Sequence, residues 1–312
     1  MDSVQTSGPA RVGSGLTTDQ RRRFDRDGYF LVEDELSSDE VAELIGVIDG
    51  IDATVRRNRR MPAGAPVSVR NIVCRHPAFQ RLLDRPRIMP LVVDLLGPWI
   101  QLRGSNFDVR PSQPPGGDAA TDDPPDRFSS WHRDEPAGGW PTVGDVVPFM
   151  ELKVGYYLTD LTAPFSGAVC VLPGSHRWPQ GGGSDGSPQR RPDRVAEINV
   201  RAGTAMIWRT SLLHRVVPNR CGRTRKCLYM AYQHRWLRPS DYVSAPAEVL
   251  AGCNPVQRQL LGALAEGMCE LRDPDVEPCS PYWTPRPEDV PLEAWARSRG
   301  VQPAATHDVA PG

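Results

Sequence analysis

Two histidines and one aspartate of this 312-residue chain have the types and spacing of a metal site. Residues 131–134 read Trp-His-Arg-Asp, and His214 follows far downstream. Because residues i and i+2 of a strand point to the same face, His132 and Asp134 are expected to reach one point. His214, from a distant strand, would complete a set of two histidines and one carboxylate. Such a set binds Fe(II) and leaves coordination positions open for oxygen and a co-substrate.

Arg225 adds a cation a short way after His214. A guanidinium at this place could hold the far carboxylate of a 2-oxo acid through two parallel hydrogen bonds. The residues therefore favour an iron- and 2-oxoglutarate-dependent oxygenase.

Two other interpretations stay open. His-x-Asp pairs are common as surface residues or as hydrogen-bonded pairs, and Arg225 has other arginines as neighbours. A cupin-type metal enzyme that uses no 2-oxoglutarate, such as an isomerase or a different dioxygenase, would bind metal without needing the arginine. A non-enzymatic β-sandwich would bind no metal.

The remaining histidines of the six have simpler explanations. His76 precedes Pro77 at a predicted helix start, where a capping role is expected. His176 lies in a Pro-Gly-Ser-His turn, where it is expected to bond loop backbone. His234 ends a predicted strand, where an ordinary partly buried histidine is expected, and His307 lies in a tail that is expected to be disordered. His132 and His214 are left as the natural pair.

Helical signals dominate the first hundred residues. Thr17-x-x-Gln20 and Ser37-x-x-Glu40 are capping boxes that predict two helix starts, and Gly50 is the expected end of the second helix. A short strand is predicted at 29–32. Further helices are predicted at 77–84, 87–96 and 254–266.

From residue 101 onward, short apolar runs between turns predict strands. The predicted strands are 101–109, 128–133, 149–158, 168–172, 195–199, 204–208, 214–217 and 226–234. About eight such strands favour a mainly β fold, a double-stranded β-helix with the jelly-roll, cupin-like core, flanked by N-terminal helices. Loops 111–127 and 178–193 are candidates for lids over a substrate.

Composition limits the partners. Lys plus Arg (37) nearly balances Asp plus Glu (38), for a formal net charge of −1. This balance predicts neither a nucleic-acid nor a membrane surface. The seven cysteines are scattered, without a C-x-x-C pair, which favours a reducing compartment over a disulfide framework. With no signal peptide or membrane-spanning run recognised, the expected location is cytoplasmic.

Two longer segments carry a family resemblance. Residues 152–160 read LKVGYYLTD, and residues 166–177 read SGAVCVLPGSHR. Together with the openings at 16–20 (LTTDQ) and 27–32 (DGYFLV), they resemble the phytanoyl-CoA dioxygenase (PhyH) family, over roughly residues 16–236.

The resemblance implies roles for individual residues. His132, Asp134 and His214 would bind Fe(II), and Arg225 would bind the C5 carboxylate of 2-oxoglutarate. Further positions beside 2-oxoglutarate would be Tyr156 and Arg110. Many family members carry a serine where Val216 stands here, so a hydroxyl would have to come from Thr210 or Thr224.

The resemblance also implies an activity. The chain would oxidise a small molecule with O2, by hydroxylation or oxidative cyclisation, and release succinate and CO2. Because the carboxylate of Asp134 is retained, halogenation is not expected. A role in the biosynthesis of specialised metabolites such as antibiotics is expected at family level, for a monomer or homodimer. The candidates for contact with substrate are Arg103, Phe107, Trp131, Arg133, Trp140 and Trp208, of which Trp131 and Trp208 equally suit the core.

The expected domain organisation follows. Residues 1–14 form a disordered N-terminus. Residues 15–236 form the oxygenase domain, with the helical layer at 15–100 and the jelly-roll core at 101–236. Residues 237–312 form a C-terminal extension that packs on the core.

Overall fold

The computed structural model describes residues 15–113, 131–134, 139–143, 147–179, 194–263 and 290–301. The expectations for residues 1–14, and most of those for the two loops, lie outside these ranges. The chain forms two compact units. The first contains Thr17–Arg70 and Asn106–Met230, and the second contains Asn71–Ser105 and the chain from Ala231 onward.

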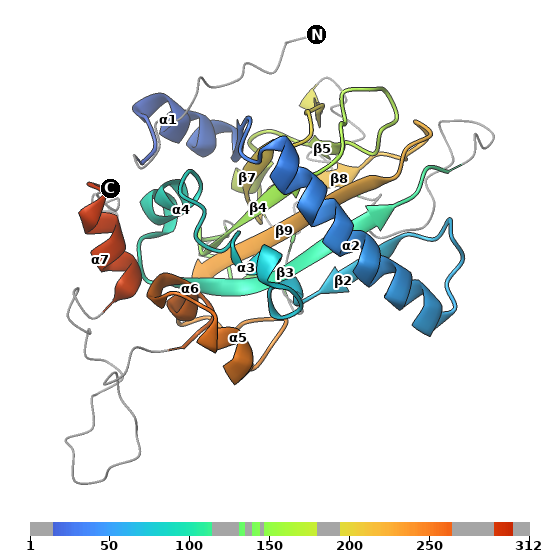
Figure 1. Cartoon of the computed structure of the whole chain (residues 1–312). Coiled ribbons are helices and arrows are strands. Elements are labelled where there is room, and N and C mark those ends of the chain that lie inside the picture. The colour runs from blue at the N-terminus through green and yellow to red at the C-terminus, as the bar shows by residue number, and fades with distance from the viewer. Residues whose placement is uncertain are drawn as a thin grey trace. The chain divides into compact units, whose positions relative to one another are not determined.

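Two antiparallel sheets dominate the chain (Figure 1). The larger sheet has the order β1-β7-β4-β9-β3-β2, formed by Tyr29–Val32, Ala205–Arg209, Glu151–Tyr157, Arg225–His234, Ile100–Arg110 and Val67–Arg70. The smaller sheet has the order β6-β5-β8, formed by Ala196–Ile198, Val169–Val171 and His214–Val216. Non-consecutive neighbours in both sheets mean that chain-distant strands meet.

An apolar cluster draws side chains from both sheets of the first unit. The larger sheet contributes Leu31, Tyr157, Met206, Trp208, Cys227 and Tyr229. The smaller sheet contributes Val169, Val171, Ile198 and Val216. Two sheets that bury their inner faces against each other make the jelly-roll arrangement that the strand pattern predicts.

Most predicted strands are present to within two residues. The exception is the strand predicted at 128–133. Residues 128–130 lie outside the described ranges, and His132 forms only an isolated bridge with His214. The strand β2 was not predicted, because Val67–Arg70 is short and its two valines alternate with a serine and an arginine.

The two predicted capping boxes begin helices of the first unit. α1 (Thr18–Asp27) starts after Thr17, and α2 (Ser38–Arg59) starts after Ser37. The predicted end of α2 at Gly50 is wrong. Gly50 is followed by further helical residues, among which Asp52 and Arg56 form an i,i+4 ion pair of 2.7 Å.

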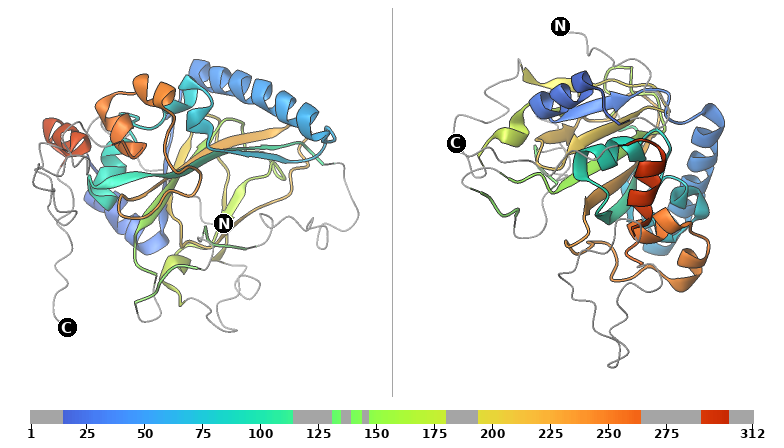
Figure 2. Two further views of the ribbon diagram at one scale, coloured as in Figure 1. Left: turned by 90° about the horizontal axis from the view of Figure 1, so that it is seen from below. Right: turned by 90° about the vertical axis from the view of Figure 1, so that its left-hand side faces the viewer.

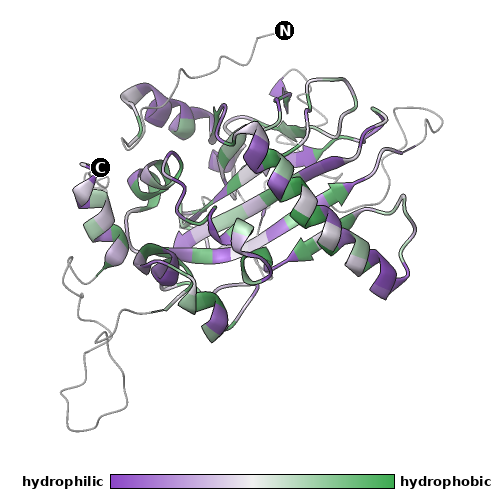
Figure 3. Cartoon of the chain, viewed as in Figure 1, coloured by the Kyte–Doolittle hydropathy of each residue, from purple (hydrophilic) through white to green (hydrophobic). Residues whose placement is uncertain are grey.

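The helix α2 ends instead at Arg60, which takes the left-handed conformation at φ 53°. Its last turn is rich in arginine and is coloured as hydrophilic in Figure 3. Figure 2 shows α2 along one face of the larger sheet, and Lys226 of β9 binds Asp49 of α2 at 2.6 Å.

The second unit holds most of the short helices, and a 3-10 turn, η1 (Ile72–Cys74). Its α-helices are α3 (Pro77–Gln80), α4 (Met89–Leu96), α5 (Ala247–Ala251), α6 (Pro255–Leu260) and α7 (Pro291–Ser298). α3 and α6 are shorter than the predicted helices, and α5 and α7 were not predicted. As expected, His76 caps α3, its Nδ1 accepting a hydrogen bond from Ala78 N at 3.1 Å. In the part of the chain that the structure describes, no helix is long and apolar enough to cross a membrane.

Candidate metal centre

The structure brings His132, Asp134 and His214 together in the first unit. His132 and His214 are paired directly, each backbone N–H donating to the other's carbonyl at 3.0 Å. Their rings lie 4.3 Å apart between centroids. One potential ligand atom from each of the three residues lies within 4.8 Å of the others. This spacing suits one metal ion.

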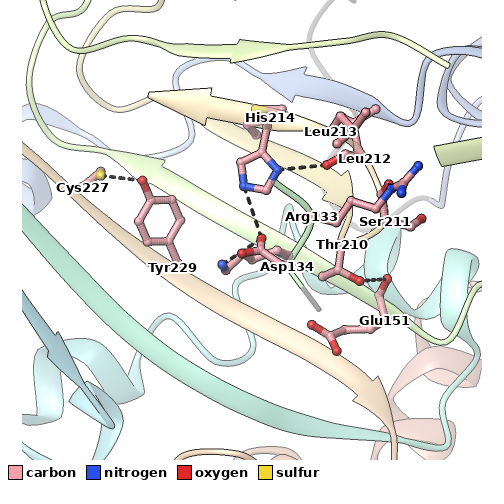
Figure 4. A network of polar contacts seen from close by, with 12 residues as sticks. Arg133, Asp134, Glu151, Thr210, Ser211, Leu212, Leu213, His214, Cys227 and Tyr229 are labelled. Carbon is pink, nitrogen blue, oxygen red and sulfur yellow. Dashed lines mark hydrogen bonds and ion pairs between the residues drawn. The ribbon is translucent and has the colours of Figure 1, made fainter. Parts of the chain in front are cut away.

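Asp134 is fixed by its backbone and by charge. Its N–H donates to the Thr210 carbonyl at 2.9 Å, two residues beyond the His132 bridge. Its Oδ2 lies 2.9 Å from Lys153 Nζ and 3.5 Å from His214 Nε2 (Figure 4 shows the latter pair). Burial acts to raise the pKa of the Asp134 carboxyl, but the positive charge of Lys153 and the nearby histidines outweigh it and lower that pKa. Burial lowers the pKa of His214 to about 4. An ionised carboxylate and a neutral imidazole are the forms that bind metal.

The second nitrogen of His214 is also held. Nδ1 lies 2.9 Å from the Leu212 carbonyl (Figure 4). Since a carbonyl can only accept, the proton sits on Nδ1, and Nε2 keeps its lone pair toward Asp134. Metal-bound histidines in proteins are usually oriented by such a bond.

The Pro-Gly-Ser-His turn supports the same strand. Ser175, in the 3-10 turn η2 (Ser175–Arg177), accepts a hydrogen bond from Leu213 N at 2.9 Å through its hydroxyl. Arg133 points away from its two neighbours and donates to the carbonyls of Ser211 (2.9 Å) and Ser175 (3.2 Å). Arg133 therefore positions the ligand-bearing segments rather than lining a substrate pocket.

His176 acts within the fold, as expected. Its Nε2 lies 3.1 Å from the Asp25 carbonyl, which links the turn to α1. Burial, aided by the charge of Arg209, lowers the pKa of His176 to about 4. The neutral ring therefore belongs to the packing between this turn and α1.

Arg225 is buried at the start of β9, with 1% of its surface exposed. Its Nη2 donates to the Tyr229 hydroxyl at 3.1 Å, while Nε and Nη1 are buried with no hydrogen-bond partner among the described residues. Burial acts to lower the pKa of Arg225, but Cys227, Tyr229 and Tyr157 keep it above the ordinary value. A buried cation with two unused donors is suited to an anion, because buried polar groups are normally paired.

Gly167 makes room for this arginine. Its backbone has φ +79°, and a Cβ there would lie 2.8 Å from Arg225 Cδ. Only glycine takes this conformation without strain and also permits the close approach.

Tyr156, expected beside the co-substrate, lies in β4, and its role stays a prediction. Lys153 of β4 contacts Asp134, and residues an even number of positions away share its face. Tyr157 therefore points to the site and belongs to the inner cluster with Tyr229. Tyr156 points to the opposite face of the sheet.

Thr210 and Arg110 lie near the site in different ways. The backbone carbonyl of Thr210 accepts a hydrogen bond from Asp134 N. The Thr210 hydroxyl donates to the Glu151 carbonyl at 3.4 Å (Figure 4). The charge of Arg110 acts to lower the pKa of Cys227, which burial raises. The role of Arg110 beside the co-substrate stays a prediction.

The expected substrate residues are dispersed. Trp208 is buried in the inner cluster and meets His214 edge-on, with ring centroids 5.9 Å apart. Trp131 is half-buried, and the Arg215 guanidinium lies 5.4 Å from the centre of the Trp131 ring. Trp140 is buried.

Two further expected substrate residues lie in β3. Phe107 is fully buried, and its contact with a substrate stays a prediction. Arg103 belongs to the second unit, whereas the three candidate ligands belong to the first.

Lys153 and Tyr229 were not singled out from the sequence. Tyr229 follows Arg225 by an even number of residues in one strand, so strand periodicity could have placed both side chains on one face. No comparable sequence signal exists for Lys153, because β4 is buried nearly throughout and lacks an alternating pattern.

The fold and the three convergent residues define a jelly-roll protein with a candidate metal-binding site. Residues 24–227 match the model of the family described as phytanoyl-CoA dioxygenase (PhyH). This chain belongs to that family, and the resemblance seen in its sequence is confirmed.

Curated relatives carry the name ectoine dioxygenase. The one from Bordetella parapertussis is 28% identical over 177 residues, which is 54% of this chain and 53% of the relative. The chain thus spans about half the length of that relative. The one from Nocardia farcinica is 24% identical over 249 residues, covering 71% of this chain and 79% of the relative.

Solved structures share the fold. EctD from S. alaskensis with bound iron superposes with a TM-score of 0.55 at 22% identity, covering 78% of this chain and 85% of that one. SnoK, a non-haem alpha-ketoglutarate-dependent carbocyclase from nogalamycin biosynthesis, has a TM-score of 0.54 at 20% identity, covering 73% and 88%. The predicted jelly-roll fold class is confirmed.

Proposed function

We propose that this protein is a non-haem Fe(II)- and 2-oxoglutarate-dependent dioxygenase that oxidises a small molecule. The observation that carries the proposal is the pairing of two features on one inner surface. His132, Asp134 and His214 converge within 4.8 Å, and Arg225 is buried with two N–H donor atoms that have no hydrogen-bond partner in the part of the chain that the structure describes.

The residues of the site have two separate roles, metal binding and co-substrate binding. Two imidazoles and one carboxylate would hold Fe(II) and leave positions for other ligands. Arg225 anchors the far carboxylate of 2-oxoglutarate by a charge-assisted, two-pronged contact. The bound iron supplies the oxidising chemistry, with O2 as oxidant and with succinate and CO2 as products. The protein contributes binding and orientation.

The reaction outcome is hydroxylation or oxidative cyclisation. Family membership and the fold shared with SnoK, which acts in nogalamycin biosynthesis, support a role in specialised-metabolite formation. The relatives named ectoine dioxygenase make ectoine the first compound to test. The protein works as a monomer or homodimer. The unpaired cysteines among the described residues support a reducing compartment such as the cytoplasm.

Anaerobic titration of the purified protein with Fe(II) and 2-oxoglutarate tests the proposal. We expect a weak visible metal-to-ligand charge-transfer band in the wild type and none in His132→Ala. His234→Ala is the matched control, because His234 lies in the second unit, stacked on Trp236, and its loss should leave the band intact. Succinate release on a panel beginning with ectoine then identifies the substrate.

Each of the two other outcomes of this titration would reject the proposed function. Iron binding without the band would favour a cupin-type enzyme that uses no 2-oxoglutarate. Absence of stoichiometric metal binding would reject the metalloenzyme altogether.

A further inference from the structure

Lys153 contacts one member of the candidate ligand set, Asp134. Its Nζ lies 2.9 Å from Asp134 Oδ2, the same oxygen that lies 3.5 Å from His214 Nε2. A metal ion held by Asp134 and His214 would bind the same carboxylate that the ammonium contacts. The ammonium and the metal would therefore have one carboxylate as a common partner.

The fold holds Lys153 in this position. β4 pairs with β7 so that Lys153 lies opposite Trp208. The ammonium lies 5.8 Å from the centre of the Trp208 ring and 5.3 Å from that of Tyr229. Aromatic faces attract a cation, and only 18% of the Lys153 side chain is exposed. The amino group is thus directed inward by the register of the sheet and by two rings.

Two cations on one buried carboxylate repel each other strongly, because a protein interior screens charge poorly. A divalent metal must therefore displace the ammonium from Asp134 or bind against its charge. Either effect weakens metal binding by the protein alone. A dianion such as 2-oxoglutarate, arriving at the metal, offsets the added positive charge and gives the displaced ammonium a new partner.

We propose that Lys153 couples metal binding to binding of the anionic co-substrate. This inference rests on the proposed function and adds a means of control: Lys153 disfavours metal without 2-oxoglutarate and favours the loaded site. Coupling of this kind is reciprocal, so each ligand raises the affinity for the other by the same factor.

A purely supporting role for Lys153 predicts the opposite sign. A group that merely orients a metal-binding carboxylate typically raises metal affinity, and its loss costs about 10- to 100-fold. The direction of the change on removing Lys153 therefore separates the two roles.

Calorimetric titration with Co(II), with and without saturating 2-oxoglutarate, provides the test. We expect Lys153→Met to bind Co(II) about tenfold more tightly than the wild type when 2-oxoglutarate is absent. The gain in Co(II) affinity caused by 2-oxoglutarate should shrink by a similar factor, within the usual range of coupling. Lys153→Arg keeps the charge and should keep the coupling.

Lys226→Met is the matched control. Lys226 binds Asp49 of α2, away from the ligand set, so its loss should leave Co(II) affinity as in the wild type. The inference is overturned if Lys153→Met binds Co(II) equally or less tightly, or keeps the full effect of 2-oxoglutarate. If the wild type binds Co(II) no better than His132→Ala, the proposed function itself has failed, and the inference fails with it.

Discussion

Replacement of Arg225 by methionine is expected to separate co-substrate binding from stability. The guanidinium is buried, its Nη2 donates to a neutral tyrosine hydroxyl, and its Nε and Nη1 have no partner among the described residues. Such a group is costly to the fold unless it has an anion to bind. Its retention in a buried position is therefore explained by a ligand.

The magnitudes follow from these contacts. Hydrogen bonds to charged groups contribute about 1.5–3 kcal/mol, so Arg225→Met should weaken 2-oxoglutarate binding by about 10- to 150-fold. Desolvation of a buried ion costs several kcal/mol, and an apolar side chain of similar length avoids that cost. We expect the free energy of unfolding without ligand to stay unchanged or to rise by up to about 3 kcal/mol.

Thermal unfolding with and without 2-oxoglutarate measures both effects. At 100 times its Kd, a ligand stabilises the wild type by about 2.7 kcal/mol, or roughly 5 °C in Tm for a chain of this size. At the same ligand concentration, Arg225→Met should keep only about 0.3–1.4 kcal/mol of this stabilisation, a loss of half to nearly all of the shift, while its Tm without ligand is maintained. Arg223→Met removes an exposed arginine of the same hairpin and should retain the shift.

Two results would refute the reasoning. A full 2-oxoglutarate shift in Arg225→Met would show that the anion is held elsewhere. A loss of more than about 3 kcal/mol of stability without ligand would show that Arg225 is structural, as for a buried charge whose partner lies in the protein.

Three further predictions concern the frame of the site. Gly167→Ala, whose Cβ would lie 2.8 Å from Arg225 Cδ, should weaken 2-oxoglutarate binding by roughly tenfold, from about 1.4 kcal/mol of displacement, and leave Co(II) affinity unchanged in calorimetry; equal loss of both would point to general misfolding. His176, with its pKa lowered from 6.5 to about 4, binds fewer protons when folded, so the stability it contributes is present above pH 6.5 and lost as pH falls toward 4. In denaturant titrations, the wild type should lose about 3 kcal/mol more than His176→Gln between pH 7.5 and 4, and equal losses would contradict this account. Ser175→Ala leaves the Leu213 N–H without its 2.9 Å partner and should cost about 1–3 kcal/mol in the same titrations; no loss would mean that another group replaces the hydroxyl.

Local sequence signals predicted much of the fold. The capping boxes at Thr17 and Ser37 begin helices because their hydrogen bonds close within four residues. Helix ends were predicted less well: Gly50 carries a stop signal, but the residues after it support further turns. The ends depend on contacts that a local pattern does not contain.

The candidate ligand set was also visible in the sequence. His132 and Asp134 reach one point because they are two residues apart in extended backbone, a property of the chain that requires no knowledge of its neighbours. His214 and Arg225 were recognised through their types and order.

The tertiary structure alone decided which face of each buried strand meets the site. β4 is buried nearly throughout, so its hydrophobic pattern does not distinguish Tyr156 from Tyr157. A shift of one residue exchanges the two faces of a strand. The pairing of β4 with β7 selected the face that carries Lys153 and Tyr157, and so placed an ammonium group on Asp134. The chain by itself determined which chemical groups are available, and the register of its sheets determined which of them meet.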